Sequence, residues 1–395
     1  MEVRKAMHIR GDVCVIGAGL MGLNTAYYLT KEGKSVVLLE QKEVANGASG
    51  ACDDMIMLQS KKPGLMLELA MSSLEIYHGL TDELQANIGF DTRGATILIQ
   101  NERELAVMEG YSARQRESGL DVVILERKDL LKYQPHVGPA IIAGTYSYVD
   151  SQVDPLRFMR SLLAHASAKG MQFVRHAKVT GVARKAEHWE VTAEGGVTVE
   201  CECVVNACGA WSPEIGRMVG LEIPITPRKG QLAITEQIPA IGKTNVLSAA
   251  YIASKIDPSL APEMSEYDKS IGKGFSFTQT YDGNYLIGST REQVGFDKST
   301  YQQAITNIIR QACFYFPILE SVSIIRTIAG FRPACADGMP IVGEVKELPG
   351  FYICAGHEGD GVALAPLTGK NLAAMIAGRP YDTRFDKLNF SRFSR

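Results

Sequence analysis

Apolar and polar positions near the start of the chain predict a strand, a turn, a helix and a second strand. A β-rich apolar run at 12–16 ends at the glycine-rich segment 17–22, which has the pattern G-x-G-x-x-G. Helical spacing of apolar residues continues to Gly33, and a second apolar run at 36–39 ends at Glu40. This order of elements is the one that a dinucleotide-binding site requires.

The residue types in this segment fit the phosphates and the ribose of a dinucleotide. Gly17 permits the tight turn, Gly19 lets a pyrophosphate approach the backbone, and Gly22 lets the helix pack closely on the strand. The N-terminus of the helix attracts the anion through its unpaired N–H groups and its dipole. Glu40 lies 18 residues after Gly22, close to where a carboxylate binds an unphosphorylated ribose. The alternative is an ordinary glycine loop, but the surrounding strands, helix and acid favour the nucleotide site.

The rest of the pattern predicts two domains. Helices are expected near 65–87, 102–118, 155–170 and 301–316, with strands at 172–175, 188–193, 197–201 and 204–208 and a long polar loop at 46–64. Strand signals dominate 226–325, whereas strand, glycine turn and helix return in 326–343 and 351–377. We therefore predict an α/β fold with a discontinuous nucleotide domain, residues 1–90, 151–225 and 326–395, and a second domain, residues 91–150 and 226–325, built on a mostly antiparallel sheet.

Composition and charge favour a small-molecule ligand. The 395 residues are 46% apolar and 22% charged, and a net charge of −3 arises from 41 basic and 44 acidic residues. This balance provides no basic surface for nucleic acid or an anionic membrane. No apolar run approaches the roughly 20 residues of a membrane helix, and we expect a cytoplasmic protein. The eight cysteines form no C-x-x-C pair, so zinc or iron–sulfur ligation is not expected.

Five segments resemble FAD-dependent oxidoreductases of the D-amino-acid oxidase, glycine oxidase and sarcosine oxidase superfamily. They are the first glycine turn with Glu40, and the segments 47–51, 204–212, 330–343 and 355–361. The resemblance implies a glutathione-reductase-like FAD-binding Rossmann domain and a separate substrate-binding domain. It also implies oxidation of the C–N bond of an amino acid, an imino acid or an opine.

Two segments resemble a narrower group within this superfamily. Residues 59–64 and 356–366 are similar to the flavin subunits of opine oxidases, D-hydroxyproline dehydrogenase and glycine-oxidising hydrogen cyanide synthase. This resemblance implies partner subunits that carry an iron–sulfur cluster and a second dinucleotide site. Lys61 and Lys62 would then bind the phosphate of an FMN at an interface with a partner. The alternative for both lysines is a solvated basic loop.

The resemblance implies a second helix end at the flavin ring. The glycine-rich segment 356–361 is similar to the loop that passes the flavin, where N–H groups stabilise negative charge. His357 is assigned to flavin contact, although a catalytic base or a structural histidine are alternatives. Glu358 meets either a substrate ammonium or guanidinium, or simply water. Across both helix ends the expected FAD-binding residues are Gly17, Gly19, Leu20, Met21, Gly22, Glu40, Gln41, Ala48, Ser49, Gly50, Val179, Ala207, Gly209, Trp211, Arg332, Gly356, His357, Glu358, Gly359, Asp360, Gly361 and Val362.

Arg332 is the residue that the resemblance assigns to the substrate carboxylate. A guanidinium offers two parallel donors and stays charged near neutral pH. The alternative is a structural ion pair with a carboxylate such as Asp337. Tyr251 is a further candidate beside the substrate, with a core or surface tyrosine as its alternative. Gly330 stands where covalently flavinylated relatives have a cysteine, so we expect non-covalent FAD.

The chemistry predicted is hydride transfer from the substrate carbon to flavin N5, followed by hydrolysis of the imine. Three alternatives stay open at this point. They are a nicotinamide-dependent dehydrogenase, a stand-alone glycine or sarcosine type of oxidase, and a non-catalytic FAD-binding subunit of an electron-transfer complex. Sequence does not choose among oxygen, a quinone and a partner's cluster as electron acceptor.

Overall fold

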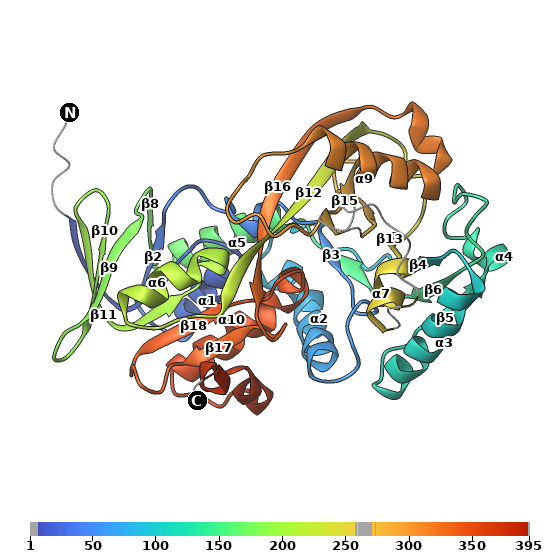
Figure 1. Ribbon diagram of the computed structural model, residues 1–395. Coiled ribbons are helices and arrows are strands. Elements are labelled where there is room, and N and C mark those ends of the chain that lie inside the picture. The colour runs from blue at the N-terminus through green and yellow to red at the C-terminus, as the bar shows by residue number, and fades with distance from the viewer. Residues whose placement is uncertain (1–6, 257–258, 260–270, 273, 394–395) are drawn as a thin grey trace.

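The computed structural model describes residues 7–256, 259, 271–272 and 274–393, and two eight-stranded sheets organise this part of the chain (Figure 1). The first sheet has the path β17-β18-β11-β1-β2-β8, with β10 and β9 attached beside β11. Its strands are β1 (Met7–Ile16), β2 (Val36–Glu40), β8 (Gln172–Arg175), β9 (Val179–Arg184), β10 (Trp189–Ala193), β11 (Val197–Asn206), β17 (Ile341–Glu344) and β18 (Phe351–Ala355).

The centre of this sheet is parallel and covered on both faces. The pairs β1·β11, β1·β2, β11·β18 and β2·β8 are all parallel. One face packs against four helices, α1 (Leu20–Lys31), α2 (Leu65–Glu83), α5 (Pro155–Ala168) and α10 (Gly361–Ile376), and the other face packs against β9, β10 and α6 (Ser212–Met218). Burial on both faces explains the continuous apolar runs in β2, in β18 and at the C-terminal end of β1.

The second sheet is antiparallel apart from one pair. Its order is β16-β12-β15-β14-β13-β4-β6-β5, and only β13·β4 is parallel among the described pairs. The strands are β4 (Ala95–Ile99), β5 (Val123–Glu126), β6 (Ala143–Ser147), β12 (Ile225–Gln237), β13 (Asn245–Ser248), β14 (Ser276–Gln279), β15 (Asn284–Gly288) and β16 (Ile324–Cys335). α9 (Gln302–Tyr315) packs with one hydrophobic cluster of this region, and α3 (Glu102–Glu117) and α7 (Ala249–Ile256) contribute to another.

Two long strands connect the sheets. In Figure 1, β12 and β16 run from the region beside the first sheet to the upper right, as an antiparallel pair. At the C-terminal end of β16, Ala334 forms a bridge with His357, which lies two residues after the end of β18. This crossing brings Arg332 of the second sheet next to the last glycine turn of the first.

The remaining elements are short. They are α4 (Arg127–Leu130), β3 (Met55–Ile56) paired with β7 (Ser151–Gln152), and the 3₁₀ turns η1 (Ala48–Gly50), η2 (Gly209–Trp211), η4 (Pro317–Ser321), η5 (Thr383–Leu388) and η6 (Phe390–Phe393). The expected boundaries at 226 and 326 both fall inside a long strand, β12 and β16. The division into two domains stays a prediction.

Candidate functional site

A cavity of about 800 Å³ extends along the ends of the parallel strands and reaches the second sheet. It is lined by most of the residues that the sequence predicted to bind FAD, and by both lysines assigned to FMN. The predicted residues on its wall are Gly17, Gly19, Leu20, Met21, Glu40, Gln41, Ala48, Ser49, Lys61, Lys62, Val179, Ala207, Gly209, Trp211, Arg332, His357, Glu358, Gly359, Asp360, Gly361 and Val362. Segments distant in the sequence therefore share one site.

The first glycine turn has the close contacts that its pattern predicted. Gly17 has a φ of +105°, and a Cβ at Gly22 would lie 1.8 Å from the carbonyl oxygen of Gly17. At the start of α1, Gly19 provides no side-chain cap, and the backbone N–H of Leu20 donates to Ser49 Oγ at 3.0 Å. Gly19 has no side chain that could cap the helix, so an anion in the cavity can approach the helix N-terminus.

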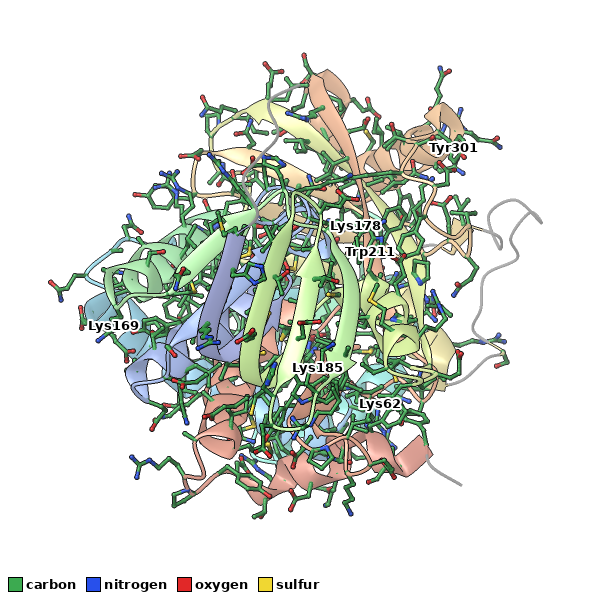
Figure 2. The ribbon with its side chains drawn as sticks, turned by 90° about the vertical axis from the view of Figure 1, so that its left-hand side faces the viewer. Lys62, Lys169, Lys178, Lys185, Trp211 and Tyr301 are labelled. Carbon is green, nitrogen blue, oxygen red and sulfur yellow. The ribbon has the colours of Figure 1, made fainter. Side chains whose placement is uncertain are left out.

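Glu40 ends β2 at the other side of this turn. Its carboxylate accepts hydrogen bonds from the backbone N–H groups of Ala18, at 2.9 Å, and Lys42, at 2.8 Å. Val179 opens β9 nearby, and Lys178 lines the same cavity near the middle of the view in Figure 2. The backbone contacts hold the carboxylate at the cavity wall, where the sequence placed the ribose.

The second helix end is formed by the 356–361 turn and α10. Asp360 precedes α10 and makes no side-chain cap to it, and Gly361 and Val362 of the first turn line the cavity. His357 is buried, with Nε2 at 3.3 Å from Thr368 Oγ1, and this burial lowers its pKa to about 4. A pKa this low makes the imidazole a weak base, which suits a structural role beside the cofactor better than proton abstraction.

Arg332 projects from β16 into the cavity. Its Nη1 donates to the carbonyl of Thr290 at 2.9 Å, and its Nη2 donates to Ser289 Oγ at 2.8 Å. Asp337, the alternative partner considered above, is paired with Arg392 at 2.7 Å. These two acceptors, Thr290 and Ser289, orient the guanidinium at the wall of the predicted substrate site.

Glu358 has a partner that the sequence analysis missed. Its Oε1 lies 2.5 Å from Nη1 of Arg228, a residue of β12 directly opposite Arg332 in the strand register. Glu358 therefore does not simply face water, which was one of its two alternatives, and its contact with a substrate cation stays a prediction. Arg291 also lines the cavity and was not predicted. No local motif marks these arginines, since only the pairing of β12 with β16 brings Arg228 to the site.

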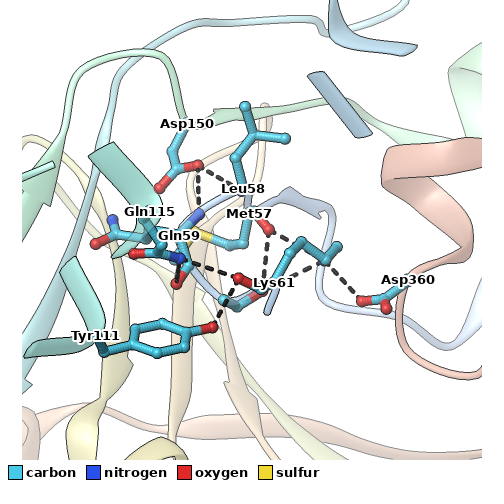
Figure 3. Close-up of polar contacts among 9 residues, drawn as sticks. Met57, Leu58, Gln59, Lys61, Tyr111, Gln115, Asp150 and Asp360 are labelled. Carbon is cyan, nitrogen blue, oxygen red and sulfur yellow. Dashed lines mark hydrogen bonds and ion pairs between the residues drawn. The ribbon is translucent and has the colours of Figure 1, made fainter. Parts of the chain in front are cut away.

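Lys61 lies inside the protein, contrary to the alternative of a solvated loop. Figure 3 shows its ammonium pointing toward Asp360, with Nζ to Oδ1 at 2.6 Å, and toward the carbonyl of Met57 at 3.0 Å. The side chain is 5% exposed. Lys62, at the lower right in Figure 2, is exposed. The two adjacent lysines therefore differ in their availability to a partner's ligand.

Polar groups from the second sheet region anchor the loop that carries Lys61. Tyr111 donates to the Lys61 carbonyl at 2.7 Å, and Gln115 donates to the same carbonyl at 3.0 Å (Figure 3). Asp150 accepts from the N–H groups of Leu58 and Gln59. Burial raises the pKa of Asp150 to about 7. This network connects the last glycine turn to α3 through an ion pair in which Lys61 is buried and Asp360 is partly exposed.

An aromatic cluster borders the cavity. Trp211, near the middle of Figure 2, stacks on Phe296 with ring centroids 4.9 Å apart and contacts Phe331 edge-on at 5.9 Å. The last site prediction, Tyr251, lies in α7, and its side chain is outside the described part of the structure. Gly22, Gly50 and Gly356 shape the turns without lining the cavity.

The described residues fit FAD. Two helices of 12 and 16 residues, α1 and α10, present N-termini without side-chain caps to one elongated cavity, at the positions expected for the pyrophosphate and the flavin ring. Glu40 stands at the ribose end. Among the described residues, no group of three or more His, Cys, Asp or Glu could hold a metal, and none of the helices is long and apolar enough to span a bilayer.

Comparison with known families agrees with this geometry. The sequence model of the family described as FAD dependent oxidoreductase matches residues 12–375. The chain is 29% identical to glycine oxidase of Bacillus licheniformis over 386 residues, which is 96% of each chain. It is 26% identical to hydrogen cyanide synthase subunit HcnC of Pseudomonas aeruginosa over 408 residues, with 92% of each chain covered.

Solved structures support the same fold. The crystal structure of glycine oxidase from Geobacillus kaustophilus superposes with a TM-score of 0.88 at 24% identity, covering 98% of this chain and 100% of that one. L-Proline dehydrogenase from P. horikoshii gives a TM-score of 0.82 at 22% identity, covering 96% and 99%. The predicted superfamily and the predicted α/β fold with a Rossmann-like FAD domain are confirmed.

Proposed function

Because the chain belongs to the family of FAD-dependent oxidoreductases, we propose that it oxidises the C–N bond of a small amine bearing a carboxylate, such as an amino acid or an imino acid. Relatives named glycine oxidase and sarcosine dehydrogenase support this reaction class. FAD is the cofactor of the family, which excludes the nicotinamide-dependent alternative.

The observation that carries the proposal is the position of Arg332 relative to α10. The guanidinium and the uncapped N-terminus of α10 line the same cavity, with Arg332 held by Thr290 and Ser289. A carboxylate bound to Arg332 would place its neighbouring C–N bond toward the flavin end of the cavity. Each hydrogen bond to a charged group contributes about 1.5–3 kcal/mol, enough to orient a small substrate.

Substrate orientation and charge stabilisation are the tasks of this chain's own residues. When bound, FAD accepts a hydride, two electrons and a proton, from the substrate carbon. Arg332 holds the carboxylate, and the N–H groups at the start of α10 stabilise negative charge. Hydride loss needs the nitrogen lone pair, and His357, whose pKa burial lowers to about 4, is too weak a base to deprotonate an ammonium, so the amine has to lose its proton to solvent before it is oxidised. Loss of the hydride leaves an iminium, which gives up its N–H proton to solvent, and water hydrolyses the imine.

An anaerobic substrate screen tests the proposal. The purified holoenzyme is mixed with amino acids, N-methylated and cyclic imino acids and opines, and the oxidised flavin absorbance is followed. Bleaching by at least one carboxylate-bearing amine, and its loss in Arg332→Ala with FAD retained, are expected. If none of these amines bleaches the flavin, the chain is a non-catalytic FAD-binding subunit. Denaturation in the same preparation should release intact FAD.

We further propose that the chain works as the flavin subunit of a larger complex. Similarity to a hydrogen cyanide synthase subunit over nearly the whole chain, and the exposed Lys62 beside the cavity, support this arrangement. Partner subunits would carry an iron–sulfur cluster and a second dinucleotide site, and Lys62 with Lys61 would approach the phosphate of an FMN. If purified complex with both lysines changed to alanine keeps its full FMN content, the FMN site is refuted.

A stand-alone oxidase is the second candidate. Similarity to glycine oxidase over 96% of both chains favours it. Affinity purification from the native cell distinguishes the two, because a flavin subunit brings its partners at fixed stoichiometry and a stand-alone oxidase does not. Rapid reoxidation of the reduced isolated chain by air would also favour the oxidase. A cytoplasmic location stays a prediction.

A further inference from the structure

A buried charged cluster lies on β12 beside the strand that carries Arg332. Lys229 is fully buried, and its Nζ lies 3.9 Å from Glu292 Oε2, 3.6 Å from Asp297 Oδ2 and 4.2 Å from the centroid of the Tyr301 ring. Tyr301 is at the upper right in Figure 2. No described residue accepts a hydrogen bond from this ammonium. The Lys229 ammonium is therefore held by its attraction to the two carboxylates and to the face of the Tyr301 ring.

The cluster fixes the segment after β15 against β12. The backbones of Lys229 and Glu292 exchange two hydrogen bonds, at 3.0 and 2.9 Å. The Glu292 carboxylate, 4% exposed, accepts from Gln231 Nε2 at 2.7 Å and from Thr290 Oγ1 at 2.5 Å. The N–H of Gln231 in turn donates to Thr290 Oγ1 at 3.0 Å. Thr290 is thus bound on both sides by groups of this cluster.

Thr290 is also the residue that holds the substrate-binding guanidinium. Its carbonyl accepts from Arg332 Nη1, and the preceding Ser289 accepts from Nη2. Gly230, between Lys229 and Gln231, leaves the space in which the guanidinium lies, since a Cβ there would be 2.3 Å from Nη1. The same few residues of β12 therefore provide the space for Arg332 and fix its acceptors.

We propose that Lys229 and Glu292 are positioning residues for Arg332, acting through Thr290. The inference rests on the proposed role of Arg332 in binding a carboxylate. Bidentate recognition depends on the orientation of the guanidinium plane, and groups that orient a binding residue contribute to its affinity. Removing one charge of a buried ion pair leaves the other charge poorly compensated inside the protein. A change at Glu292 should therefore move the segment that holds Thr290.

Two comparisons distinguish a positioning role from a general effect on stability. They are Thr290→Val against Thr290→Ser, and Glu292→Gln against Ile308→Ala. Thr290→Val keeps the side-chain shape but removes the hydroxyl, whereas Thr290→Ser keeps the hydroxyl. Glu292→Gln removes the charge opposite Lys229 with little change in size. Ile308→Ala is the control, because Ile308 is buried in α9 within the core of the second sheet region and its truncation destabilises the fold.

The measurement uses holoenzyme and acetate, a carboxylate without an oxidisable C–N bond. Acetate affinity is measured from the change in flavin absorbance, together with Tm, FAD content and separate kcat and KM values. Thr290→Val and Glu292→Gln should weaken acetate binding and raise KM by about ten-fold, with a smaller change in kcat. Thr290→Ser should stay close to the wild type. Ile308→Ala should lower Tm with its acetate affinity unchanged.

The outcomes distinguish this inference from the proposed function. If the wild type binds acetate and oxidises an amino acid, but Thr290→Val and Glu292→Gln bind acetate no more weakly than Ile308→Ala, the positioning role is refuted and the proposed function stands. A wild type that neither binds acetate nor oxidises any carboxylate-bearing amine refutes both. Equal loss of affinity in Thr290→Ser and Thr290→Val also contradicts the role of the hydroxyl.

Discussion

A single methyl group at Gly230 should displace Arg332, the arginine that we propose binds the substrate carboxylate. In the structure, a Cβ at this position would lie 2.3 Å from Arg332 Nη1 and 2.8 Å from both Cζ and Nη2. The backbone of Gly230 is not in the left-handed region, so alanine causes no backbone strain there. An ordinary contact begins near 3.4 Å, and the guanidinium must therefore shift by about 1 Å. The fold of β12 has no reason to change.

The size of the effect follows from the hydrogen bonds that the shift breaks. A movement of this length exceeds the tolerance of a bidentate contact, and one bond between the guanidinium and the carboxylate is lost. Hydrogen bonds to charged groups contribute about 1.5–3 kcal/mol, and 1.4 kcal/mol corresponds to a factor of ten. We expect kcat/KM for a carboxylate-bearing amine to fall by about ten- to a hundred-fold, mainly through KM.

Steady-state kinetics with a substrate identified by the anaerobic screen, with FAD content measured in parallel, tests this reasoning. Gly79→Ala is the matched control, because a Cβ on this exposed glycine of α2 meets no atom within 4 Å. The control should keep wild-type kinetics and a Tm at least as high. If Gly230→Ala keeps its kcat/KM within two-fold of the control, Arg332 does not bind the substrate carboxylate in the orientation described here.

Three further changes have expected outcomes. Gly22→Ala should yield protein without bound FAD, because its Cβ would collide with the Gly17 carbonyl at 1.8 Å, and a normal flavin spectrum would contradict the proposed pyrophosphate site. Asp150 has a folded-state pKa of about 7 against an ordinary 3.8, so its contribution to stability is fully present below pH 4 and is lost as pH rises through 7. As pH rises from 4 to 8, Asp150→Asn should therefore become more stable relative to the wild type, by up to about 4 kcal/mol in the free energy of unfolding measured with denaturant. If both proteins have the same pH profile of stability, ionisation of the buried carboxylate does not destabilise the wild type. Lys61→Met removes the 2.6 Å ion pair of Asp360 near the predicted flavin position and leaves the Asp360 charge uncompensated. The flavin midpoint potential should fall by about 20–60 mV as a result. An unchanged potential would mean that the ion pair lies too far from the flavin to affect it.

Local patterns predicted the parts of the site that are contiguous in the chain. Glycines at 17, 19 and 22 have specific steric requirements, and the structure has the corresponding close contacts. The predicted helix of 102–118 is α3, Glu102–Glu117, because Asn101 caps it and polar residues define its exposed face. Hydrophobic periodicity and helix capping depend on residues that are close together in the chain, so the sequence alone is sufficient to predict them.

Contacts that depend on strand register were not predictable in the same way. Arg228 meets Glu358 because β12 pairs with β16, and nothing near Arg228 in the sequence indicates this pairing. Lys61 was predicted to lie in solvent or at an interface, since two adjacent lysines in a polar loop are normally exposed. Its burial follows from Tyr111 and Gln115 on α3, which hold the loop from a distant part of the chain.

The cationic side chains at the cavity wall contact different groups. Lys61 and Arg228 neutralise the carboxylates of the last glycine turn, Asp360 and Glu358, at 2.6 and 2.5 Å. Arg332 donates to the Thr290 carbonyl and to the Ser289 hydroxyl, and these two acceptors fix the direction of its guanidinium. A carboxylate at position 289 would add negative charge beside the guanidinium and compete with a substrate anion for it. Exchanging Ser289 for aspartate should therefore weaken carboxylate binding, measured as the acetate affinity of the holoenzyme.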